Sequence, residues 1–371
     1  MIPVNRPLLT AEDNAYVLNS LKETWISGEA PPVATLEKSL CETLGTKYAV
    51  AFSSGTTAID IAVEAIDIKK GDECILPSFT IISTASNILR KGGRLVLVDA
   101  DPVTWSMDAP TTAETISEKT KLVMPVHIYG LPVDMDPILE QSNKFNTFIV
   151  EDAAEALGVK YKNRECGTIG DAGIFSFYAN KIVTGGEGGA IVTNDEAYSQ
   201  RLRYLRNLCF NPNERFVHEE LGWNGRISAL SASLVVSQLS RLPNLLDKKI
   251  KIGRRYREGL KDHPYFDYQP DAVPYSQNCY WVFGILLNKE SKMNAKELQL
   301  KLKSLDIDTR RFFCPLHLQP LAKKYDIQIV GDLKFSEYLW DMGLYLPSGL
   351  GTTDSEIDQV IETLWTLVEK K

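Results

Sequence analysis

Short apolar runs alternate with segments of helical periodicity through the first half of the chain. Five of these runs are rich in apolar and β-branched residues, and they lie at 48–51, 74–76, 95–98, 122–126 and 148–150. Near-continuous apolar strands separated by helical stretches are typical of a mostly parallel sheet that helices cover on both faces. The pattern therefore predicts an α/β fold for this half of the chain.

The second half shows a different order of elements. Apolar residues recur at helical spacing over 228–242, Pro243 is expected to close that helix, and the basic stretch 248–257 is predicted to be a solvated helix face. One strand, two helices and one further segment follow, at 280–287, 294–305, 354–369 and 308–313. We predict a large α/β domain over 1–243 and a smaller C-terminal α+β domain over 244–371, although the first residues can pack on the small domain.

Composition narrows the class of protein. The 371 residues are 44% hydrophobic and 24% charged, as in ordinary globular proteins. A net charge of −7 without a long basic run argues against nucleic acid as a partner. Six scattered cysteines without a C-x-x-C pair indicate neither a metal site nor a disulfide framework, so a cytoplasmic protein is expected. Without a signal peptide or a run of 18 apolar residues, neither export nor a membrane span is expected.

Lys181 carries the most chemical information. It ends the run 175–181, and a glycine-rich segment follows at 184–189. A lysine held at the end of a strand can form a Schiff base with an aldehyde cofactor when part of the amine population is neutral. Free lysine has a pKa of about 10.4, so such a site must desolvate the amine or surround it with positive charge. The glycines let the backbone turn tightly beside a bulky ligand.

A phosphate site is predicted at Gly55 and Thr56. The segment 54–57 follows a predicted strand and opens a predicted helix, so that free N–H groups and hydroxyls converge at the positive helix end. The alternative is that Ser54 is only the N-cap of this helix. The spacing matches neither the dinucleotide fingerprint nor the nucleotide-triphosphate loop. Ser176 would lie beside the same strand end and could give a hydroxyl to the phosphate.

Asp152 ends another predicted strand, at the edge of the sheet where ligands usually bind. A buried carboxylate needs a cationic partner, and a protonated pyridine nitrogen would be one. The alternative is a capping box in which Asp152 and Glu155 serve their own helix. Asn224 precedes a predicted helix and is by default a turn residue. A phosphate site, a carboxylate for a ring nitrogen and an imine-forming lysine together match pyridoxal 5'-phosphate.

These residues resemble a known family, the sugar aminotransferases of the DegT type, within the aspartate-aminotransferase fold (pyridoxal 5'-phosphate fold type I). The similarity covers nearly the whole chain, with motifs at 24–28, 53–58, 126–130, 151–156, 175–189 and 315–317. The resemblance implies a large domain with a mostly parallel sheet and a smaller C-terminal α+β domain. It also implies pyridoxal 5'-phosphate as cofactor and a homodimer with shared active sites.

The resemblance assigns roles around the cofactor. Lys181 would form the Schiff base and shuttle protons, and Asp152 would pair with the pyridine nitrogen. Glu155 would lie near the phenolic oxygen of the cofactor. The residues expected to hold the phosphate are Gly55, Thr56, Ser176 and, from the neighbouring subunit, Asn224.

The substrate residues follow from the same resemblance. Those expected on the sugar side are Trp25, Ile26, Ser27, Arg226 and His317, of which the last two are as readily structural. The chain also departs from the family. Ile81 stands where relatives place an aromatic ring against the pyridine, and three further departures fall in segments that line the sugar side, at Gly225, Arg311 and Cys314.

The resulting hypothesis is a transaminase in which glutamate gives its amino group and leaves as 2-oxoglutarate. The acceptor would be a 4-keto-6-deoxy nucleotide sugar, and the product a 4-amino sugar nucleotide for surface glycans. Lys181 favours amination, because relatives that dehydrate such sugars carry histidine there. Another ketone remains open as substrate, namely a 3-keto sugar, an amino-cyclitol precursor or a small ketose phosphate that Arg311 would bind. A non-catalytic sensor or scaffold would require a damaged lysine or carboxylate, and both are intact.

Overall fold

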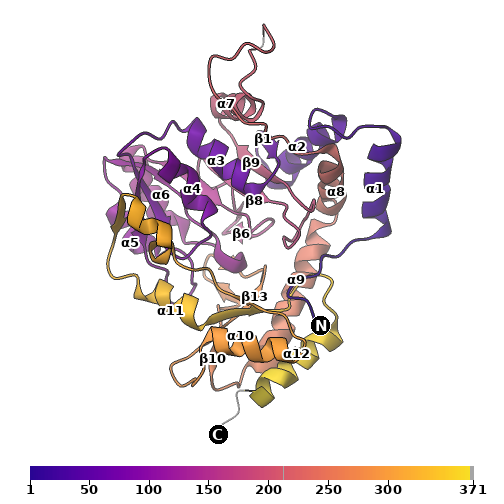
Figure 1. The fold of residues 1–371 in the computed structure, drawn as a ribbon, viewed down its shortest axis with the longest axis vertical. Coiled ribbons are helices and arrows are strands. Elements are labelled where there is room, and N and C mark those ends of the chain that lie inside the picture. Colours follow the sequence, from indigo (N-terminus) through magenta and orange to yellow (C-terminus); the bar gives the residue numbers. More distant parts are fainter. Residues whose placement is uncertain (212, 368–371) are drawn as a thin grey trace.

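The computed structural model describes residues 1–211 and 213–367, and an eight-stranded sheet forms its larger part (Figure 1). In spatial order the strands are β1 (Tyr48–Phe52), β9 (Gly189–Thr193), β8 (Ala172–Ser176), β5 (Phe148–Asp152), β4 (Thr120–Val123), β2 (Glu73–Pro77), β3 (Arg94–Val98) and β15 (Ile327–Ile329). In this sheet β9 is antiparallel to both neighbours, and the other neighbouring pairs are parallel. The predicted α/β class and mostly parallel sheet are confirmed.

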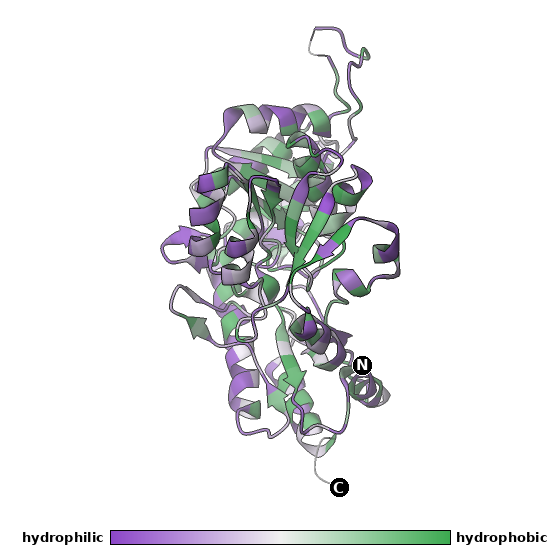
Figure 2. Cartoon of the chain, turned by 90° about the vertical axis from the view of Figure 1, so that its left-hand side faces the viewer, coloured by the Kyte–Doolittle hydropathy of each residue, from purple (hydrophilic) through white to green (hydrophobic). Residues whose placement is uncertain are grey.

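Helices cover both faces of this sheet, as alternation along β1 illustrates. Ala49 and Ala51 point into one core, and Val50 and Phe52 into the other. The first core includes residues of α2 (Pro31–Leu44), α5 (Ala109–Thr115), α6 (Met135–Phe145) and α8 (Ala229–Leu239), and α1 (Ala11–Lys22) packs on α8. The second includes residues of α3 (Gly55–Ala65), α4 (Ser83–Arg90) and α7 (Glu196–Arg206). Figure 2 shows the hydrophobic strands in the interior, between helices with hydrophilic outer faces.

A smaller antiparallel sheet lies in the second half of the chain. Its strand order is β10 (Phe266–Asp267), β13 (Phe283–Leu287), β16 (Gly343–Leu346) and β14 (Arg310–Arg311). A third core joins it to α9 (Leu242–Leu260), α10 (Ala295–Ser304) and α12 (Asp354–Leu367). The second half of the chain also contains helix α11 (Lys334–Met342). Two short strand pairs lie outside both sheets, namely β6 (Lys160–Tyr161) with β7 (Arg164–Glu165), and β11 (Ala272–Val273) with β12 (Ser276–Gln277).

Two segments cross the predicted boundary at residue 243. Strand β15 belongs to the second half of the chain but pairs with β3 in the large sheet. Ile2 belongs to the first half but forms a bridge with Ile307 and packs in the third core. The division into 1–243 and 244–371 therefore stays a prediction, to which β15 is an exception.

Helix α9 corrects two expectations. Pro243 does not close α8 but lies in the first turn of α9, where its missing N–H costs no hydrogen bond. The stretch 248–257 is not solvated throughout, because Lys249 is buried and its Nζ donates to the carbonyl oxygen of Ser348. The segment before α12 supplies that carbonyl, and Leu350 and Trp281 line the same small void as Lys249, so chain segments from outside α9 cover this cationic position. Helix α12 packs on α9 as well (Figure 1).

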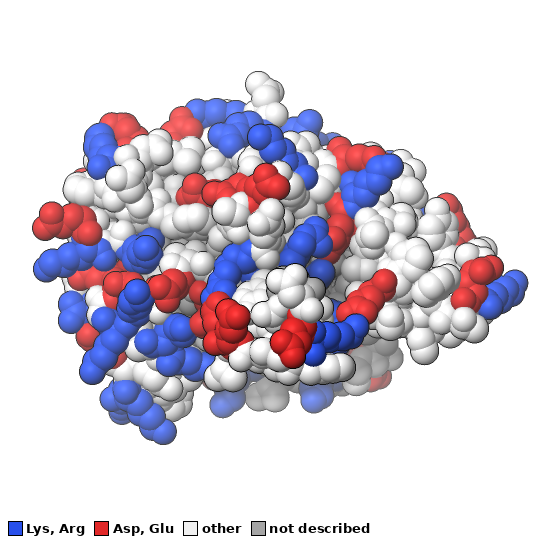
Figure 3. All heavy atoms as spheres, turned by 90° about the horizontal axis from the view of Figure 1, so that it is seen from above, with Lys and Arg blue, Asp and Glu red and all other residues white. Residues whose placement is uncertain are grey.

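Acidic and basic side chains are interspersed on the face that Figure 3 shows. Among the helices of the described residues, we find none with the length and apolar character that crossing a bilayer requires. A long loop after α7, comprising residues 208–211 and 213–223, extends away from the body at the top of Figure 1.

Candidate active site

A cavity of about 350 Å³ lies where β5 and β8 end and α3 begins. Residues from the small sheet close its other side, among them Arg310, Arg311 and Tyr345. Of the residues predicted from sequence, the cavity brings together Gly55, Thr56, Ile81, Asp152, Glu155, Ser176, Lys181 and Arg311. It does not include Trp25, Ile26, Ser27, Asn224, Arg226 or His317.

One end of the cavity is the N-terminus of α3. Ser54 is its N-cap, and its Oγ accepts from the Thr57 N–H at 3.0 Å. The cap does not exclude the phosphate site predicted at Gly55 and Thr56, which stays a prediction. Gly55 begins the helix beside Ser176, and a Cβ at position 55 would lie 3.0 Å from the Ser176 Cβ. A larger residue at position 55 would therefore push the Ser176 side chain away from the helix terminus. Free N–H groups, the Ser176 hydroxyl and a positive helix end suit a phosphate.

Asp152 is the last residue of β5, and only 4% of its surface is exposed. Its Oδ1 accepts from the Ala154 N–H at 3.1 Å, and the residue forms no ion pair with the described residues. Burial raises the pKa of this carboxyl above its usual value. No helix follows at 153–156, so the capping-box alternative is wrong. A buried carboxylate with one hydrogen bond suits a cationic ring nitrogen.

A second buried carboxylate lies behind Asp152. Glu151 contacts Nε2 of His127 at 2.9 Å and accepts three backbone N–H bonds, which come from Gly167, Ile169 and Gly170. His127 Nδ1 accepts from the Val133 N–H, so Nε2 carries the proton. Sequence reasoning gave this pair no role, although a glutamate inside an apolar strand signals a buried hydrogen-bond network.

Lys181 lies in the loop between β8 and β9, not at the strand end as predicted. The sequence predicted either desolvation of this amine or positive charge around it. The Lys181 side chain is 12% exposed, so the structure agrees with desolvation. The amine Nζ is 3.4 Å from Glu155 Oε1 and 3.8 Å from the centroid of the Trp281 ring. Trp281 Nε1 donates to the Asn180 carbonyl at 2.9 Å, which ties the indole to the lysine loop.

Glu155 is the acidic partner of this amine. Its Oε2 accepts from the Tyr129 N–H at 2.8 Å, and the residue is 7% exposed. Burial raises the pKa of the carboxyl to about 7, and the contacts with Lys181 and the Tyr129 N–H only partly offset that effect. Glu155 is therefore poised to gain or lose a proton near neutral pH.

The two arginines of β14 differ. The Arg311 guanidinium lies 3.6 Å from the Trp340 ring centroid and donates to the Trp340 carbonyl at 2.7 Å, so it packs against α11. Arg310 is exposed, lines the cavity and forms no ion pair with the described residues. Sequence reasoning missed Arg310 and Trp281, because both come from the second half of the chain and no local pattern marks them.

The residues outside the cavity form a second cluster. Arg226 Nε donates to Asn224 Oδ1 at 3.0 Å, and its guanidinium pairs with Glu29 at 3.1 Å. Trp25 and Ile26 are 50% and 54% exposed, and the Ile26 carbonyl accepts from the Ala229 N–H.

His317 lies apart from this cluster. Its Nδ1 contacts the Ser78 hydroxyl at 2.7 Å, and its Nε2 contacts Glu337 at 3.1 Å. Both ring nitrogens are thus engaged by protein atoms. A substrate role for His317 stays a prediction.

The cavity suits pyridoxal 5'-phosphate on structural grounds. It offers a helix terminus that begins with glycine for the phosphate, a buried carboxylate without an ion-pair partner in the described part of the chain for a cationic nitrogen, and a largely buried lysine side chain for the aldehyde. Ile81 is 45% exposed and lines the same cavity, where the ring needs an apolar neighbour.

Comparison with known proteins agrees with this geometry. The DegT/DnrJ/EryC1/StrS aminotransferase family matches residues 7–365. A GDP-perosamine synthase of Caulobacter vibrioides is 36% identical over 363 residues, covering 98% of this chain and 97% of that protein. A GDP-perosamine synthase of Escherichia coli O157:H7 is 32% identical over 364 residues, with 98% and 97% covered.

Solved structures of similar fold include a GDP-4-keto-6-deoxymannose-3-dehydratase mutant with bound GDP-perosamine. It superposes with a TM-score of 0.91 at 26% identity, covering 98% of this chain and all of the other. The Escherichia coli GDP-4-keto-6-deoxy-D-mannose-3-dehydratase with bound hydrated pyridoxal phosphate gives 0.91 at 26% identity, with 98% and 99% covered. These likenesses confirm the fold class that the sequence predicted.

Proposed function

Because the chain belongs to the DegT/DnrJ/EryC1/StrS aminotransferase family, whose cofactor is pyridoxal 5'-phosphate, we propose that it moves an amino group from glutamate to a 4-keto-6-deoxy nucleotide sugar. The products are 2-oxoglutarate and a 4-amino-4,6-dideoxy sugar nucleotide for surface glycans such as lipopolysaccharide O-antigen. The relatives named GDP-perosamine synthase and the neighbour with bound GDP-perosamine support this acceptor. A neighbour described as holding a trapped PLP-glutamate geminal diamine supports glutamate as donor.

Lys181 carries this proposal. It stands in the cavity where sugar dehydratases of this family have histidine, and its amine is buried between a carboxyl and an indole. When bound, pyridoxal phosphate supplies an aldehyde that takes up the amino group and a ring that accepts electrons. Lys181 would hold the cofactor through its aldehyde and would move a proton to or from the reacting carbon. Asp152 would keep a proton on the ring nitrogen, and the N-terminus of α3 together with Ser176 would hold the phosphate.

Arg310 is proposed as the binding residue for a glutamate carboxylate. Its guanidinium lines the cavity and forms no ion pair with residues 1–211 or 213–367, and guanidinium groups bind carboxylates with two parallel hydrogen bonds. Arg310→Gln should raise the KM for glutamate roughly tenfold or more, since a charge-assisted bond contributes about 1.5–3 kcal/mol. Arg90→Gln, at an exposed ion pair outside the cavity, is the matched control.

The decisive assay supplies glutamate and a panel of 4-keto-6-deoxy sugars linked to GDP, dTDP or UDP. Release of 2-oxoglutarate together with an amino sugar nucleotide, detected by mass spectrometry, is the expected result, and GDP is the expected nucleotide. Lys181→Ala should abolish release. If the wild-type protein released no 2-oxoglutarate with any member of the panel, the proposal would be wrong.

A different ketone remains the second candidate. A small ketose phosphate would need a cation in the cavity, and Arg310 offers a free one, whereas the Arg311 guanidinium is occupied by Trp340. Competition with free GDP separates the two candidates. Inhibition by GDP favours the nucleotide sugar, and its absence favours the compact phosphate.

A homodimer with shared active sites is also proposed. Asn224 lies outside the cavity and accepts a hydrogen bond from Arg226. Trp25 and Ile26 are exposed, and the loop after α7 exposes Phe216 by 74% and Leu221 by 92%. Exposed apolar side chains on a projecting loop favour contact with another protein surface. A second copy is the partner that would bring Asn224 and the cluster around Trp25 to a cavity. The cytoplasm is the proposed compartment, because six free cysteines suit reducing conditions.

A further inference from the structure

Glu155 and Lys181 form a closed pair inside the cavity. Their side chains are 8% and 12% exposed, and Glu155 Oε1 lies 3.4 Å from Lys181 Nζ. The Trp281 indole bounds the amine on a further side, with its ring centroid at 3.8 Å. On its remaining side the amine faces the cavity, so Glu155 is the carboxyl in direct contact with it and the nearest group that can exchange a proton with it.

Other groups that face Glu155 have different roles. The Tyr129 N–H fixes Oε2, and Cys279 Sγ contacts the Glu155 backbone carbonyl at 3.8 Å. The remaining titratable neighbours are Asp152, Tyr345 and the phenol of Tyr129. Burial raises the pKa of both tyrosines, that of Tyr345 to about 12, so both phenols are poor sources of protons near neutral pH. Oε1 of Glu155 is thus the oxygen left free to exchange a proton with the amine.

We propose that Glu155 stores the proton of Lys181 and returns it directly across the contact between Oε1 and Nζ. This inference deepens the proposed transamination and rests on it. In the forward direction the Glu155 O–H bond breaks, its electron pair stays on the carboxylate, and a new N–H bond forms with the amine lone pair. The reverse transfer restores a neutral amine. Glu155 acts through Lys181, so it is a positioning residue that also carries a proton.

The transfer gives Lys181 both forms that the reaction needs. A neutral amine removes a proton from a reacting carbon, and an ammonium group delivers one. Burial raises the pKa of Glu155 to about 7, which is the range where holding and releasing a proton are balanced. An amide at position 155 would still accept the Tyr129 N–H but would hold no such proton.

Infrared difference spectra of the cofactor-free protein, and of the loaded protein after glutamate is added, test the stored proton. Wild type should show a protonated-carboxyl band at about pH 6 that fades above about pH 8. Glu155→Gln should lack this band. Glu356→Gln should retain it, because Arg6 holds the pKa of Glu356 at about 2. An unchanged band in Glu155→Gln would overturn the proposal.

A second measurement follows the single turnover of loaded enzyme with glutamate alone. Glu155→Gln should be roughly 10²-fold slower near pH 7 and lose the limb of the pH profile near 7, whereas Glu155→Asp should keep that limb. A wild-type pH profile in Glu155→Gln would also overturn the proposal. Inertness of the wild type toward glutamate would instead overturn the proposed function, and the infrared bands would still decide where the proton lies.

Discussion

Ile81 offers the cavity an aliphatic face where related enzymes place an aromatic ring. Its side chain is 45% exposed and lines the cavity. We predict that Ile81→Phe tightens pyridoxal phosphate binding roughly fivefold, because a stacked aromatic pair contributes about 1 kcal/mol. Fluorescence titration with the cofactor measures this. Ile329→Phe on β15, at a similarly exposed position outside the cavity, should change nothing, and equal affinities of both variants and wild type would contradict the role given to Ile81.

Asp152 is expected to cost stability while it serves the cofactor. Burial raises the pKa of the Asp152 carboxyl in the folded protein above its value in the unfolded chain. The free energy of unfolding therefore falls as pH rises from the unfolded pKa through the folded one. Asp152→Asn should therefore raise the unfolding free energy of cofactor-free protein by about 1 kcal/mol at neutral pH. The same change should lower transamination at least 100-fold or so, because it removes the charge that holds the ring proton. Urea unfolding and glutamate turnover measure the two effects. A variant that is both active and less stable would contradict this account.

The sequence allowed the cofactor-site residues to be predicted where they lie at or near the carboxyl ends of neighbouring strands. Asp152 and Ser176 end adjacent strands, Gly55 opens α3 beside them, and Lys181 follows in the next loop. Trp281 and Arg310 were not predictable, because their place in the cavity depends on how the second half of the chain docks. The capping-box alternative for Asp152 could only be decided by the backbone that follows.

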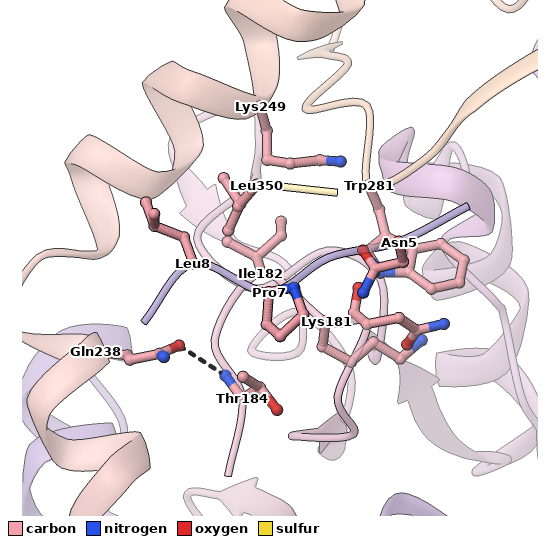
Figure 4. Close-up of a pocket in the computed structure, with 11 residues that line it drawn as sticks. Asn5, Pro7, Leu8, Lys181, Ile182, Thr184, Gln238, Lys249, Trp281 and Leu350 are labelled. Atoms are coloured by element: carbon pink, nitrogen blue, oxygen red, sulfur yellow. Dashed lines mark hydrogen bonds between the residues drawn. The ribbon is translucent and has the colours of Figure 1, made fainter. Parts of the chain in front are cut away.

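At the scale of elements, α9 buries a lysine that the sequence suggested was solvated. Lys249 borders a void of about 10 Å³ together with Asn5, Lys181 and Trp281, as Figure 4 shows. Burial lowers the pKa of Lys249 to about 7. Helical periodicity in a basic stretch identifies the helix, but it cannot show that a later segment covers one of its cationic positions.

Lys249→Met should stabilise the protein in a way that depends on pH. Between about pH 7 and 10, Lys249 is protonated in the unfolded chain but mostly neutral in the folded protein. The free energy of unfolding of the wild type therefore rises with pH across this window, and this stability is lost as pH falls back to about 7. The variant should be more stable by about 4–5 kcal/mol below pH 7, and the gain should shrink toward pH 10. Lys251→Met, exposed on the same helix, is the control. A gain independent of pH would contradict the pKa assigned to Lys249.

At the scale of the whole molecule, shared active sites predict complementation between inactive variants. Lys181→Ala and Asn224→Ala should each be nearly inactive as pure proteins. After mixing and subunit exchange, a mixed dimer has one cavity with both residues, so roughly a quarter of wild-type activity should return. Turnover with glutamate before and after exchange measures this. No recovery, with dimers present by ultracentrifugation, would show that Asn224 serves its own subunit.

The architecture of the molecule was largely predictable, and its exceptions have a physical cause. The parallel sheet followed from apolar runs, because such strands are buried on both faces. Strand β15 is only three residues long and mostly exposed, and its pairing with β3 is a long-range contact that its short run of apolar residues does not reveal. A division of the chain by composition alone could not have placed β15 in the large sheet.

The central claim is that Lys181 forms the covalent bond to pyridoxal phosphate. Borohydride reduction of the cofactor-loaded protein tests this claim directly. After reduction and proteolysis, mass spectrometry should find a phosphopyridoxyl group on the peptide that contains Lys181, with the visible absorption of the cofactor lost. Attachment at another lysine, or no attachment at all, would contradict the assignment of the cavity.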